Sequence, residues 1–515
     1  MKRRHFVTTA AATLGLTLVP ARSQVVLAQP QFSANPFSLG VASGDPWPHS
    51  VVLWTRLAPD PLNGITLPPM AIPVQWQMAT DPEMATVVAQ GTALAAPEFA
   101  HAVHVVVDRL EPGQWYWYQF QAGSARSAIG RTRTAPGPSD TVDQLQFAFV
   151  SCQHYEHGYY TAYQHLAQAN LDLVFHLGDY IYEGHPQSGQ PRQHIGARAS
   201  DLDSYRLRYA QYKLDPHLQA AHAAFPFICT WDDHEVENDY AADQSQSFAD
   251  PTVFRRRRAA AYQAYYEHLP LRPSAQPQGA TLQLYRHFQF GDLVEFNVLD
   301  TRQYRDDQPC AKPSKGGGQI LLGCAERLNP ERTMLGVKQE AWLMDNLKQS
   351  QARWTVIAQA QLMAELEQLP GPGTAYWSEG WDGYAANRQR ILQWIEAYRP
   401  ANPIVLSGDL HSFWVADLQP DPHDPQSPVV ATEFGGTSIS SQGPSYRLLS
   451  LAIPENPHIK FFDSRLRGYV HCTVERDLWV SHLQAVETVE TPDAPLRTLA
   501  TFAVKEGQPG AQRLG

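Results

Sequence analysis

The hydrophobic pattern of the chain changes near residue 140. Before that point, from about residue 31 to residue 138, short segments such as IPVQWQMATD and QWYWYQFQAG alternate apolar and polar positions, and turn residues separate them. Short alternating segments of this kind predict an all-β domain. The Pro- and Gly-rich stretch TAPGPSDTVD that follows predicts a linker.

The turn at residues 110–113 indicates which type of β-domain this region forms. It reads Leu-Glu-Pro-Gly, and Tyr116 and Tyr118 follow it. This turn and tyrosine pattern resembles that of fibronectin type III sandwiches. We therefore predict a fibronectin type III or immunoglobulin-like β-sandwich over residues 31–138.

Residues 144–509 have a different pattern, in which apolar runs of strand length alternate with segments of helical period. The runs LQFAFV, LDLVFHL, FPFICT and NPIVLS are predominantly apolar, which is typical of strands buried on both faces. GVKQEAWLMDNLKQS predicts a helix with Val337, Trp342, Leu343 and Leu347 roughly on one face. Because strands return towards the C-terminal end, we predict an α/β fold with two sheets packed face to face between helices, a four-layer α/β/β/α core.

Polar side chains follow each of the four apolar runs. The four segments are Ser151-Cys152-Gln153, Gly178-Asp179-Tyr180-Ile181-Tyr182, Trp231-Asp232-Asp233-His234-Glu235 and Gly408-Asp409-Leu410-His411. Open α/β sheets bind ligands outside the carboxyl ends of their strands. Because Asp, His, Cys and Tyr gather at four such ends, the sequence predicts a metal site before any other function.

Some of these side chains suit a pair of cations. Asp179 can bridge two ions, because one carboxylate has two oxygens at the spacing of a dinuclear site, where the ions lie ~3.5–4 Å apart. A phenolate from Tyr182 favours a ferric ion over zinc. Cys152 would add a second anionic ligand and His411 a neutral one.

Other side chains suit a harder cation or the substrate. Asp233 and Asp409 are hard oxygen donors, which calcium and magnesium prefer. His234 follows an acidic ligand and can face the substrate as a proton donor. Arg302, in LDTRQYR, could hold a substrate phosphate bidentately or could pair with Asp300.

Composition and charge restrict the partners. The chain has 515 residues, 43% hydrophobic and 18% charged, which is typical of a globular protein of two or three domains. Its formal charge of −11 argues against a surface for nucleic acid or anionic membrane, which needs excess Lys and Arg. The run of four arginines at residues 255–258 is the local exception, and it lies in a segment of helical pattern where a solvated or ion-paired face is expected.

Residues 1–28 have the pattern of an export signal, with a basic start, a modest apolar stretch and a small-residue exit. Arg3 and Arg4, followed by Phe6, resemble the signal that the twin-arginine export machinery recognises, and a Sec signal that holds two arginines is the alternative. No later run approaches ~18 consecutive apolar residues. We therefore predict a periplasmic or extracellular protein without a stable membrane anchor.

Five cysteines fit an exported protein but do not suggest a disulfide scaffold. Cys310 and Cys324 flank AKPSKGGGQILLG and form the natural disulfide pair. Cys229 and Cys472 lie in apolar strand-like runs, where we expect buried small hydrophobic residues. Cys152 ends a strand beside polar residues, where a thiolate could ligate a metal.

Seven segments, in order along residues 39–509, carry a family resemblance. They are GVASGDPWPHSVVLWTRL, FVSCQ, HLGDYIYE, TWDDHEVENDY, NVLDTRQYR, LSGDLHSFWVADL and EFGGTSIS. Together they resemble the PhoD-type alkaline phosphatases, a branch of the calcineurin-like metallophosphoesterases. The resemblance implies a four-layer catalytic domain over residues 144–509, an exported enzyme, and a site with one ferric ion and one or two calcium ions.

Carried over residue by residue, the resemblance assigns ligands. Cys152, Asp179, Tyr182 and His411 match the iron ligands. Asp179, Asp409 and an oxygen donor of the WDDHEVEND segment match the calcium side. Purple acid phosphatases share the wider plan, but they have Asp at the position of Cys152 and His at the position of Asp409, so the resemblance is to the PhoD type.

Three assignments stay open. The wider superfamily has Asn just before the catalytic His, where this chain has Asp233, and Asn238 is the alternative donor. Asp232 is a candidate to brace His234 from behind. The segment GGTS at residues 435–438 could cradle an anion with backbone amides, although a tight turn between strands is the expected reading.

The leading hypothesis is an exported alkaline phosphatase and phosphodiesterase that hydrolyses phosphate mono- and diesters. A metal-held hydroxide attacks phosphorus, the cations stabilise the developing charge, and His234 protonates the leaving alkoxide. A phospholipase D-like diesterase with the same site is the alternative, although no amphipathic membrane-binding helix is evident. A non-catalytic adhesion protein is a third reading, which the complete ligand set disfavours.

Overall fold

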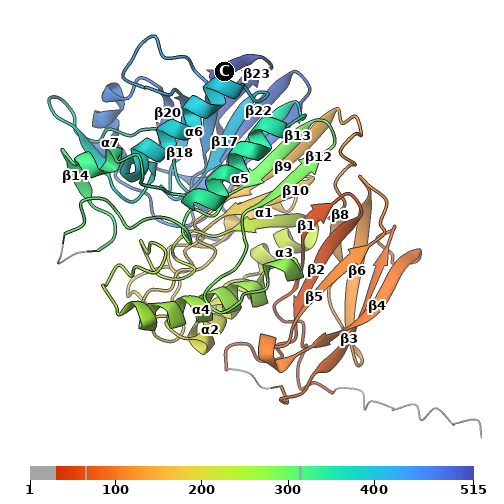
Figure 1. Ribbon diagram of the computed structural model, residues 1–515. Coiled ribbons are helices and arrows are strands. Elements are labelled where there is room, and N and C mark those ends of the chain that lie inside the picture. The colour runs from red at the N-terminus through yellow and green to blue at the C-terminus, as the bar shows by residue number, and fades with distance from the viewer. Residues whose placement is uncertain (1–30, 64–66, 313–315, 515) are drawn as a thin grey trace, which may run out of the picture.

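The computed structural model describes residues 31–63, 67–312 and 316–514, so the predicted export signal lies outside the described residues. A ten-stranded and a seven-stranded sheet pack face to face, and a smaller five-stranded sheet covers one end of the molecule (Figure 1). Among the described residues, no helix is both long and apolar enough to cross a bilayer.

The ten-stranded sheet joins the two regions of the chain. Its strands are, in order, β24 (Gln508–Arg513), β23 (Leu496–Lys505), β22 (Leu478–Val486), β21 (Arg467–Glu475), β9 (Gln144–Val150), β10 (Leu173–Leu177), β11 (Pro226–Thr230), β1 (Val41–Trp47), β2 (Ser50–Arg56) and β5 (Ala102–Asp108). β9, β10 and β11 are parallel neighbours, and β1 adds to the sheet parallel to β11. Three strands of the N-terminal region therefore extend the central sheet.

The seven-stranded sheet belongs wholly to the second region. Its strands are, in order, β12 (Arg286–Phe290), β13 (Val294–Val298), β15 (Trp354–Ala358), β17 (Pro403–Ser407), β19 (Ala431–Gly435), β18 (Phe413–Leu418) and β20 (Ile459–Asp463). The four central strands, β13, β15, β17 and β19, run parallel. Their carboxyl ends therefore share one edge of the sheet.

The N-terminal region forms a sandwich. The five-stranded sheet contains β4 (Val87–Ala95), β3 (Ile72–Ala79), β6 (Trp115–Ala122), β7 (Ala125–Arg126) and β8 (Gly130–Arg133). It packs on β1, β2 and β5 through one apolar cluster. Tyr116 bonds back to the turn at residues 110–113, because its Oη accepts from the backbone N–H of Glu111 at 3.0 Å, as in the predicted sandwich type. Because β1, β2 and β5 also belong to the central sheet, the sheets do not separate the two domains. We propose the domain boundary between residues 138 and 144 because the sequence pattern changes there.

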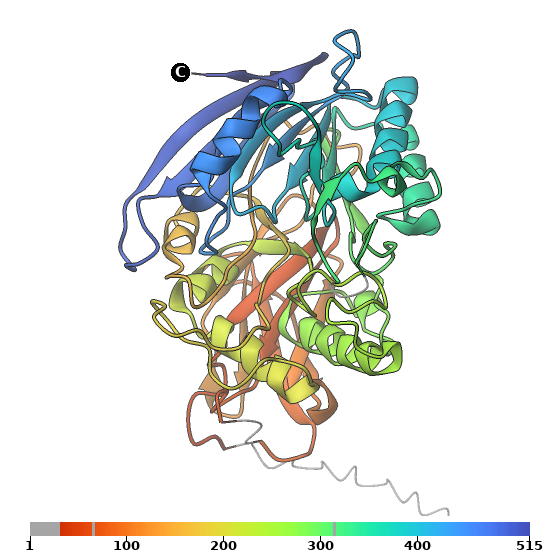
Figure 2. The same cartoon turned by 90° about the vertical axis from the view of Figure 1, so that its left-hand side faces the viewer.

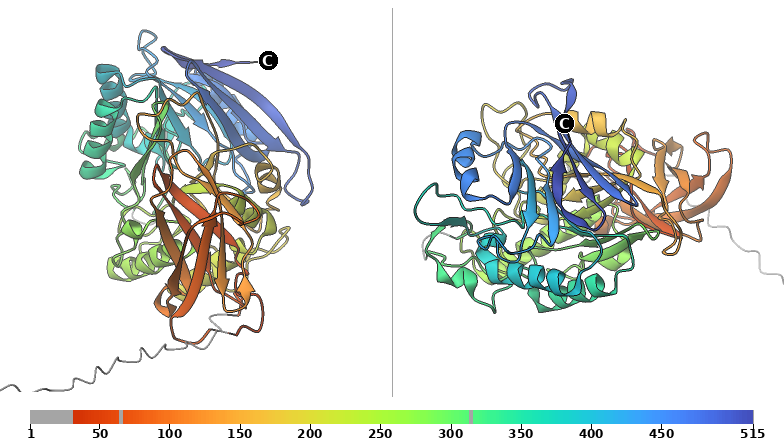
Figure 3. Two further views of the ribbon diagram at one scale, coloured as in Figure 1. Left: turned by 90° about the vertical axis from the view of Figure 1, so that its right-hand side faces the viewer. Right: turned by 90° about the horizontal axis from the view of Figure 1, so that it is seen from above.

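Helices cover the outer faces of the two central sheets. They are α1 (Thr161–Leu166), α2 (Leu202–Lys213), α3 (Pro216–Ala224), α4 (Pro251–His268), α5 (Gly336–Gln349), α6 (Ala385–Tyr398) and α7 (Tyr446–Ala452). Figures 2 and 3 show α2 and α4 on the side of the ten-stranded sheet, and α5 and α6 on the side of the seven-stranded sheet. The predicted four-layer α/β/β/α core is confirmed.

Alternate residues of the central strands enter different cores. Phe147 and Phe149 of β9 lie in the cluster between the two sheets, whereas Ala148 and Val150 pack with the helices on the outer face. Both faces are buried, so the strands read as continuous apolar runs. Trp354 of β15 enters the same inter-sheet cluster from the facing sheet.

The prediction of one apolar face on α5 is partly wrong. Leu343 and Leu347 are buried and Trp342 packs against the same core, but Val337 is 82% exposed. Six residues turn a helix by ~600°, which places Val337 ~120° away from Leu343.

Two other sequence predictions are confirmed. Cys310 and Cys324 form a disulfide, and Cys229 and Cys472 are free and buried. The arginine run lies on α4, where Arg258 pairs with Asp243 at 2.9 Å and Arg257 bonds Glu237 and the Tyr205 hydroxyl. The helix therefore has an ion-paired face, as expected of a charge run in a globular protein.

Candidate metal centre

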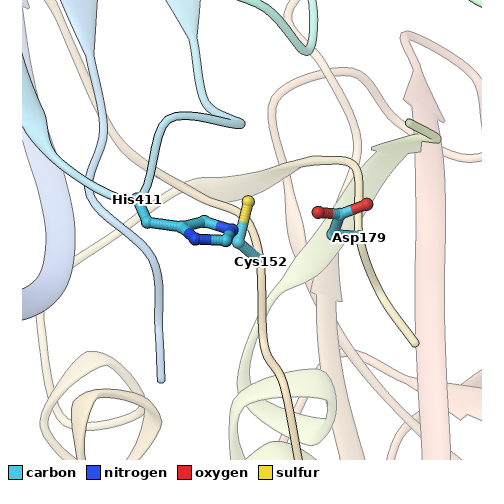
Figure 4. A group of neighbouring side chains, drawn as sticks. All are labelled: Cys152, Asp179 and His411. Atoms are coloured by element: carbon cyan, nitrogen blue, oxygen red, sulfur yellow. The ribbon is translucent and has the colours of Figure 1, made fainter. Parts of the chain in front are cut away.

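Four strand ends meet at one place in the structure. β9 ends before Cys152, β10 before Asp179 and β11 before Asp233, all at the same edge of the ten-stranded sheet, and β17 of the facing sheet ends before Asp409 and His411. Ligand atoms of Cys152, Asp179 and His411 lie within 4.8 Å of one another (Figure 4). The structure thus brings together side chains that are up to 259 residues apart in sequence (411 − 152).

Four of these residues have a left-handed backbone. The φ angles are 58° at Cys152, 55° at Asp179, 59° at Asp409 and 51° at His411. Non-glycine residues rarely adopt this region, and strained backbone of this kind clusters at functional sites. The segments after β9, β10 and β17 therefore turn sharply where each strand ends, and these turns position the four side chains.

Two glycines allow the strand ends to approach. A Cβ on Gly178 would lie 2.6 Å from the Cβ of Asp232, and a Cβ on Gly408 would lie 2.6 Å from the Ser151 hydroxyl. Any larger residue would push β10 from β11, or one sheet from the other. The glycine in each Gly-Asp pair therefore fixes the position of the aspartate that follows.

Tyr182 joins Asp179 to His411. Its hydroxyl donates to Asp179 Oδ2 at 2.9 Å, lies 3.1 Å from His411 Nε2, and accepts from the Ser441 hydroxyl at 2.8 Å. His411 Nδ1 contacts the carbonyl of Gln442 at 2.8 Å, which leaves Nε2 directed at the site. The four residues that match the iron ligands, Cys152 included, therefore surround one point.

Asp179 belongs to three groups of neighbouring ligand atoms. Besides the group with Cys152 and His411, it lies within 4.8 Å of the donors of Asp233 and His234, and within 4.8 Å of those of Asp232 and Asp409. A carboxylate shared between adjacent groups is the arrangement that a bridging ligand needs.

The charges of this donor set fit bound cations. Burial, and then neighbouring carboxylates, hold the pKa of Asp179, Asp409 and the Cys152 thiol well above their ordinary values. Burial also raises the pKa of Asp232 to about 7, and its Oδ2 has no hydrogen-bond partner in the described part of the chain. Because a cation favours the anionic form of each group, it would relieve this repulsion.

A buried carboxylate orients His234, and it is not the one that the sequence suggested. Glu183 Oε2 lies 2.7 Å from His234 Nδ1, whereas the Asp232 carboxylate accepts from Arg302. The suggestion that Asp232 orients His234 is therefore wrong. Burial opposes a charge on His234, but Asp233, Asp179 and Glu183 raise its pKa well above the ordinary value. Glu183 ends the segment HLGDYIYE, four residues after Asp179, so its position gave a signal that was missed.

Arg302 is fully buried among carboxylates. Its Nε donates to Asp232 Oδ1 at 2.5 Å, its Nη1 and Nη2 donate to Glu379, and its Nη2 lies 3.8 Å from Asp233 Oδ2. Arg302 donates to Asp300 through its backbone N–H, while its guanidinium bonds Asp232 and Glu379, so the alternative of a side-chain pair with Asp300 is wrong. Glu379 was missed because nothing in its local sequence marks it.

The remaining candidates lie beside the centre. Asn238 is half-buried, and its backbone N–H donates to Glu183 at 3.1 Å. At residues 435–438 the Gly436 N–H donates to the carbonyl of Ser407 and the Ser438 hydroxyl donates to that of Ser441. These bonds within the protein are those of the expected turn.

Known proteins are similar to this chain in sequence and fold. A family model described as PhoD-like phosphatase matches residues 147–483, and a model of the PhoD-like phosphatase N-terminal domain matches residues 21–136. The chain is 46% identical over 525 residues to alkaline phosphatase D of Bacillus subtilis (strain 168), covering 99% of this chain and 89% of that protein. A solved structure described as "Structure of PhoD" superposes with a TM-score of 0.91 and 47% identity, covering 94% of this chain and 93% of that one.

Proposed function

The chain belongs to the PhoD-like phosphatase family and is a phosphoric ester hydrolase, and from this membership we propose that it hydrolyses phosphate mono- and diesters at a centre of one ferric ion and one or two calcium ions. The observation that carries the proposal is the position of Asp179, which lies in three adjacent groups of ligand atoms. Its two oxygens make different contacts, Oδ2 with Tyr182 and Oδ1 with the backbone N–H of His234.

In this proposal the iron ligands are Cys152, Asp179, Tyr182 and His411. A thiolate, a phenolate, a carboxylate and an imidazole form a donor set that suits iron better than calcium, which prefers oxygen alone. When bound, paired cations supply Lewis acidity to the phosphate and lower the pKa of a bound water.

Asp179 and Asp409 supply the calcium side, with Asp233 or Asn238 as a further oxygen donor. A carboxylate oxygen of Asp233 lies within 4.8 Å of ligand atoms of Asp179 and His234, which supports Asp233 as this donor. The Asp233 carboxylate also accepts from the backbone N–H groups of His234 and Asp239, at 2.9 and 2.6 Å, and these bonds fix its orientation.

His234 is the general acid of the proposed reaction. Glu183 holds Nδ1, so Nε2 is the atom that faces the substrate, and its proton goes to the oxygen of the leaving alcohol. His234 lies against the ring of Tyr182, with centroids 4.1 Å apart, which limits rotation of the imidazole. Glu183 itself is buried and also accepts from the Asn238 N–H, so the orienting carboxylate is fixed in turn.

For Arg302 we propose that the guanidinium offsets the negative charge of Asp232, Asp233 and Glu379. Its ion pairs with Asp232 and Glu379 support this role, because they use the N–H groups of the guanidinium within the protein. Direct binding of substrate phosphate stays a prediction. We also propose export through the twin-arginine signal of residues 1–28, on the sequence pattern alone.

The function is tested with p-nitrophenyl phosphate and bis(p-nitrophenyl) phosphate. We expect both to be hydrolysed, a calcium chelator to abolish turnover, and added calcium to restore it. Activity that is indifferent to chelation would contradict the calcium half of the site. Absence of hydrolysis of both esters by metal-replete protein would contradict the whole proposal.

A further inference from the structure

The segment that follows β19 packs against the end of β9. The backbone N–H groups of Ser440 and Ser441 donate to the carbonyl of Cys152, at 3.5 and 3.2 Å, although Ser441 lies 289 residues further along the chain. This segment continues the sequence EFGGTSIS, to which the proposed function gives no role. It therefore joins a motif without a function to a proposed iron ligand.

The hydroxyl of Ser441 lies between two of the proposed iron ligands. Its Oγ is 2.8 Å from Tyr182 Oη and 2.7 Å from the carbonyl oxygen of Cys152. It also accepts from the backbone N–H of His154 at 3.2 Å. Ser441 is fully buried, so solvent does not compete for these contacts. Because a hydroxyl has one proton to donate, Ser441 can donate to only one of the two oxygens at a time.

The carbonyl of Cys152 does not need this proton. It already accepts from the backbone N–H groups of Ser440 and Ser441, and a carbonyl oxygen has two lone pairs. A phenolate is the stronger acceptor of the two, since hydrogen bonds to charged groups are roughly twice as strong as neutral ones. When Tyr182 is a phenolate, the Ser441 proton is therefore directed at its Oη.

The other neighbours of Tyr182 Oη do not donate to a phenolate. Asp179 Oδ2, at 2.9 Å, is an acceptor. His411 Nδ1 lies 2.8 Å from the carbonyl of Gln442, so Nδ1 carries the proton of the neutral ring and Nε2 presents a lone pair. In the part of the chain that the structure describes, Ser441 is thus the remaining hydrogen-bond donor to Tyr182 Oη.

A hydrogen bond at this oxygen affects a bound iron in two ways. It stabilises the anionic form of Tyr182, which is the form that binds a cation. It also lowers the energy of the phenolate electrons, so the oxygen gives less electron density to the iron. An iron that receives less electron density is a stronger Lewis acid, and partners behind a ligand tune metals in this way.

We infer that Ser441 is a positioning residue that donates a hydrogen bond to the phenolate of Tyr182 and thereby sets how much electron density this ligand gives to the iron. This inference rests on the proposed function, in which Tyr182 is an iron ligand. It extends that function to a serine outside the ligand set and gives the motif EFGGTSIS, with the residue that follows it, a role in the chemistry of the site.

Ser441→Ala tests the inference in the iron-loaded protein. Ferric phenolates absorb visible light by transferring charge from phenolate to iron. Loss of the hydrogen bond raises the energy of the phenolate electrons, so we expect the absorption band of the variant at longer wavelength than that of the wild type. We also expect ~10–100-fold weaker binding of iron, measured by competition with a chelator, since this is the usual cost of losing a partner behind a metal ligand.

Exchange into D₂O tests the hydrogen bond itself. In resonance Raman spectra excited in the visible band, the C–O stretch of Tyr182 should shift in D₂O in the wild type, because an exchangeable proton bonds the phenolate oxygen. The shift should be absent in Ser441→Ala. Ser441→Thr keeps a hydroxyl and should restore the shift and the position of the band.

The control is Ser440→Ala, because Ser440 is the adjacent buried serine and its hydroxyl donates to the carbonyl of His154 at 2.8 Å rather than to a proposed ligand. This variant should keep the wild-type band, the D₂O shift and the affinity for iron. An unmoved band and a retained D₂O shift in Ser441→Ala would overturn the inference and leave the proposed function intact. Equal loss of iron affinity in both alanine variants, with the band unmoved, would show that the segment only supports the fold. A wild type without phenolate modes would instead contradict the proposed ligand set.

Discussion

The two oxygens of the Asp179 carboxylate have different partners. Oδ2 accepts from the Tyr182 hydroxyl at 2.9 Å, and Oδ1 faces the backbone N–H of His234 at 3.3 Å. The φ of 55° at Asp179 and the close approach of Gly178 to Asp232 fix where this carboxylate lies. Asp179 is therefore the candidate ligand that bridges the iron and calcium sides of the proposed centre, because of where its carboxylate lies.

His234→Ala tests the general acid. A poor leaving group needs a proton, whereas p-nitrophenolate does not, so we expect the variant to lose ~10²–10⁴-fold in kcat on alkyl phosphates and much less on p-nitrophenyl phosphate. Metal content should stay near that of the wild type. The measurement is kcat over a series of leaving groups. An equal loss for all substrates would remove His234 from the acid role, and loss of a metal would make it a ligand.

Glu183→Gln tests whether Glu183 positions His234. An amide at Glu183 keeps the shape but loses the charge that contributes to the raised pKa of His234. We therefore expect the same dependence on leaving group as in His234→Ala, but a smaller loss, and a pH profile whose alkaline limb moves to lower pH. A uniform loss with an unchanged profile would indicate that Glu183 only supports the fold.

At the residue scale, the sequence predicted the positions of side chains that lie directly after a strand. Each strand-end segment follows an apolar run, so Cys152, Asp179, Asp409 and His411 could be placed at the edge of a sheet before the structure was known. The contact between Arg302 and Glu379 could not, because it joins residues 77 apart in sequence through the tertiary fold alone.

Among the elements, the buried strands were the most predictable. Strands buried on both faces are predominantly apolar, and β9, β10, β11 and β17 follow this pattern. The pairing of β1 with β11 was not predictable, since the partner of a strand depends on topology and not on its own pattern. Val337 on α5 is exposed, which shows that an approximate helical period does not predict whether a single residue is buried.

A cluster of charges ties the loop after β15 to helix α6 and gives a stability prediction. Glu365 accepts from Arg388 at 2.6 Å and Arg327 at 3.2 Å. Burial alone would raise the pKa of Glu365, but Arg388, Arg327 and His423 lower it to about 2, from an ordinary value of 4.5. A lowered folded pKa stabilises the native state above pH 4.5 and loses this effect as the pH falls towards 2.

Glu365→Gln should therefore destabilise the protein near neutral pH by on the order of 3 kcal/mol, since each pKa unit corresponds to ~1.4 kcal/mol. The difference from wild type should shrink as the pH falls from 4.5 towards 2. Urea unfolding followed by fluorescence at several pH values measures both. The control is Glu326→Gln, because Glu326 pairs with Arg332 at a more exposed position and should change stability little at any pH. A pH-independent difference for Glu365→Gln would contradict the charge explanation.

For the whole molecule, the proposed twin-arginine signal predicts that the protein folds before export. The twin-arginine route carries folded proteins, so a chain exported by it would load its metals in the cytoplasm. Replacing Arg3 and Arg4 with Lys should block export, while the protein that remains in the cell stays folded and active. Fractionation followed by activity measurement tests this. Unchanged secretion would favour the Sec alternative.

The metal content of the purified protein tests the central claim most directly. Elemental analysis of the wild type, purified without chelator from its native export route, should give about one iron and one or two calcium ions per chain. Cys152→Ser should lose the iron but keep the circular dichroism spectrum of the wild type, because the thiol supplies a ligand and not core packing. A wild type without iron, or a Cys152→Ser variant with full iron content, would contradict the account.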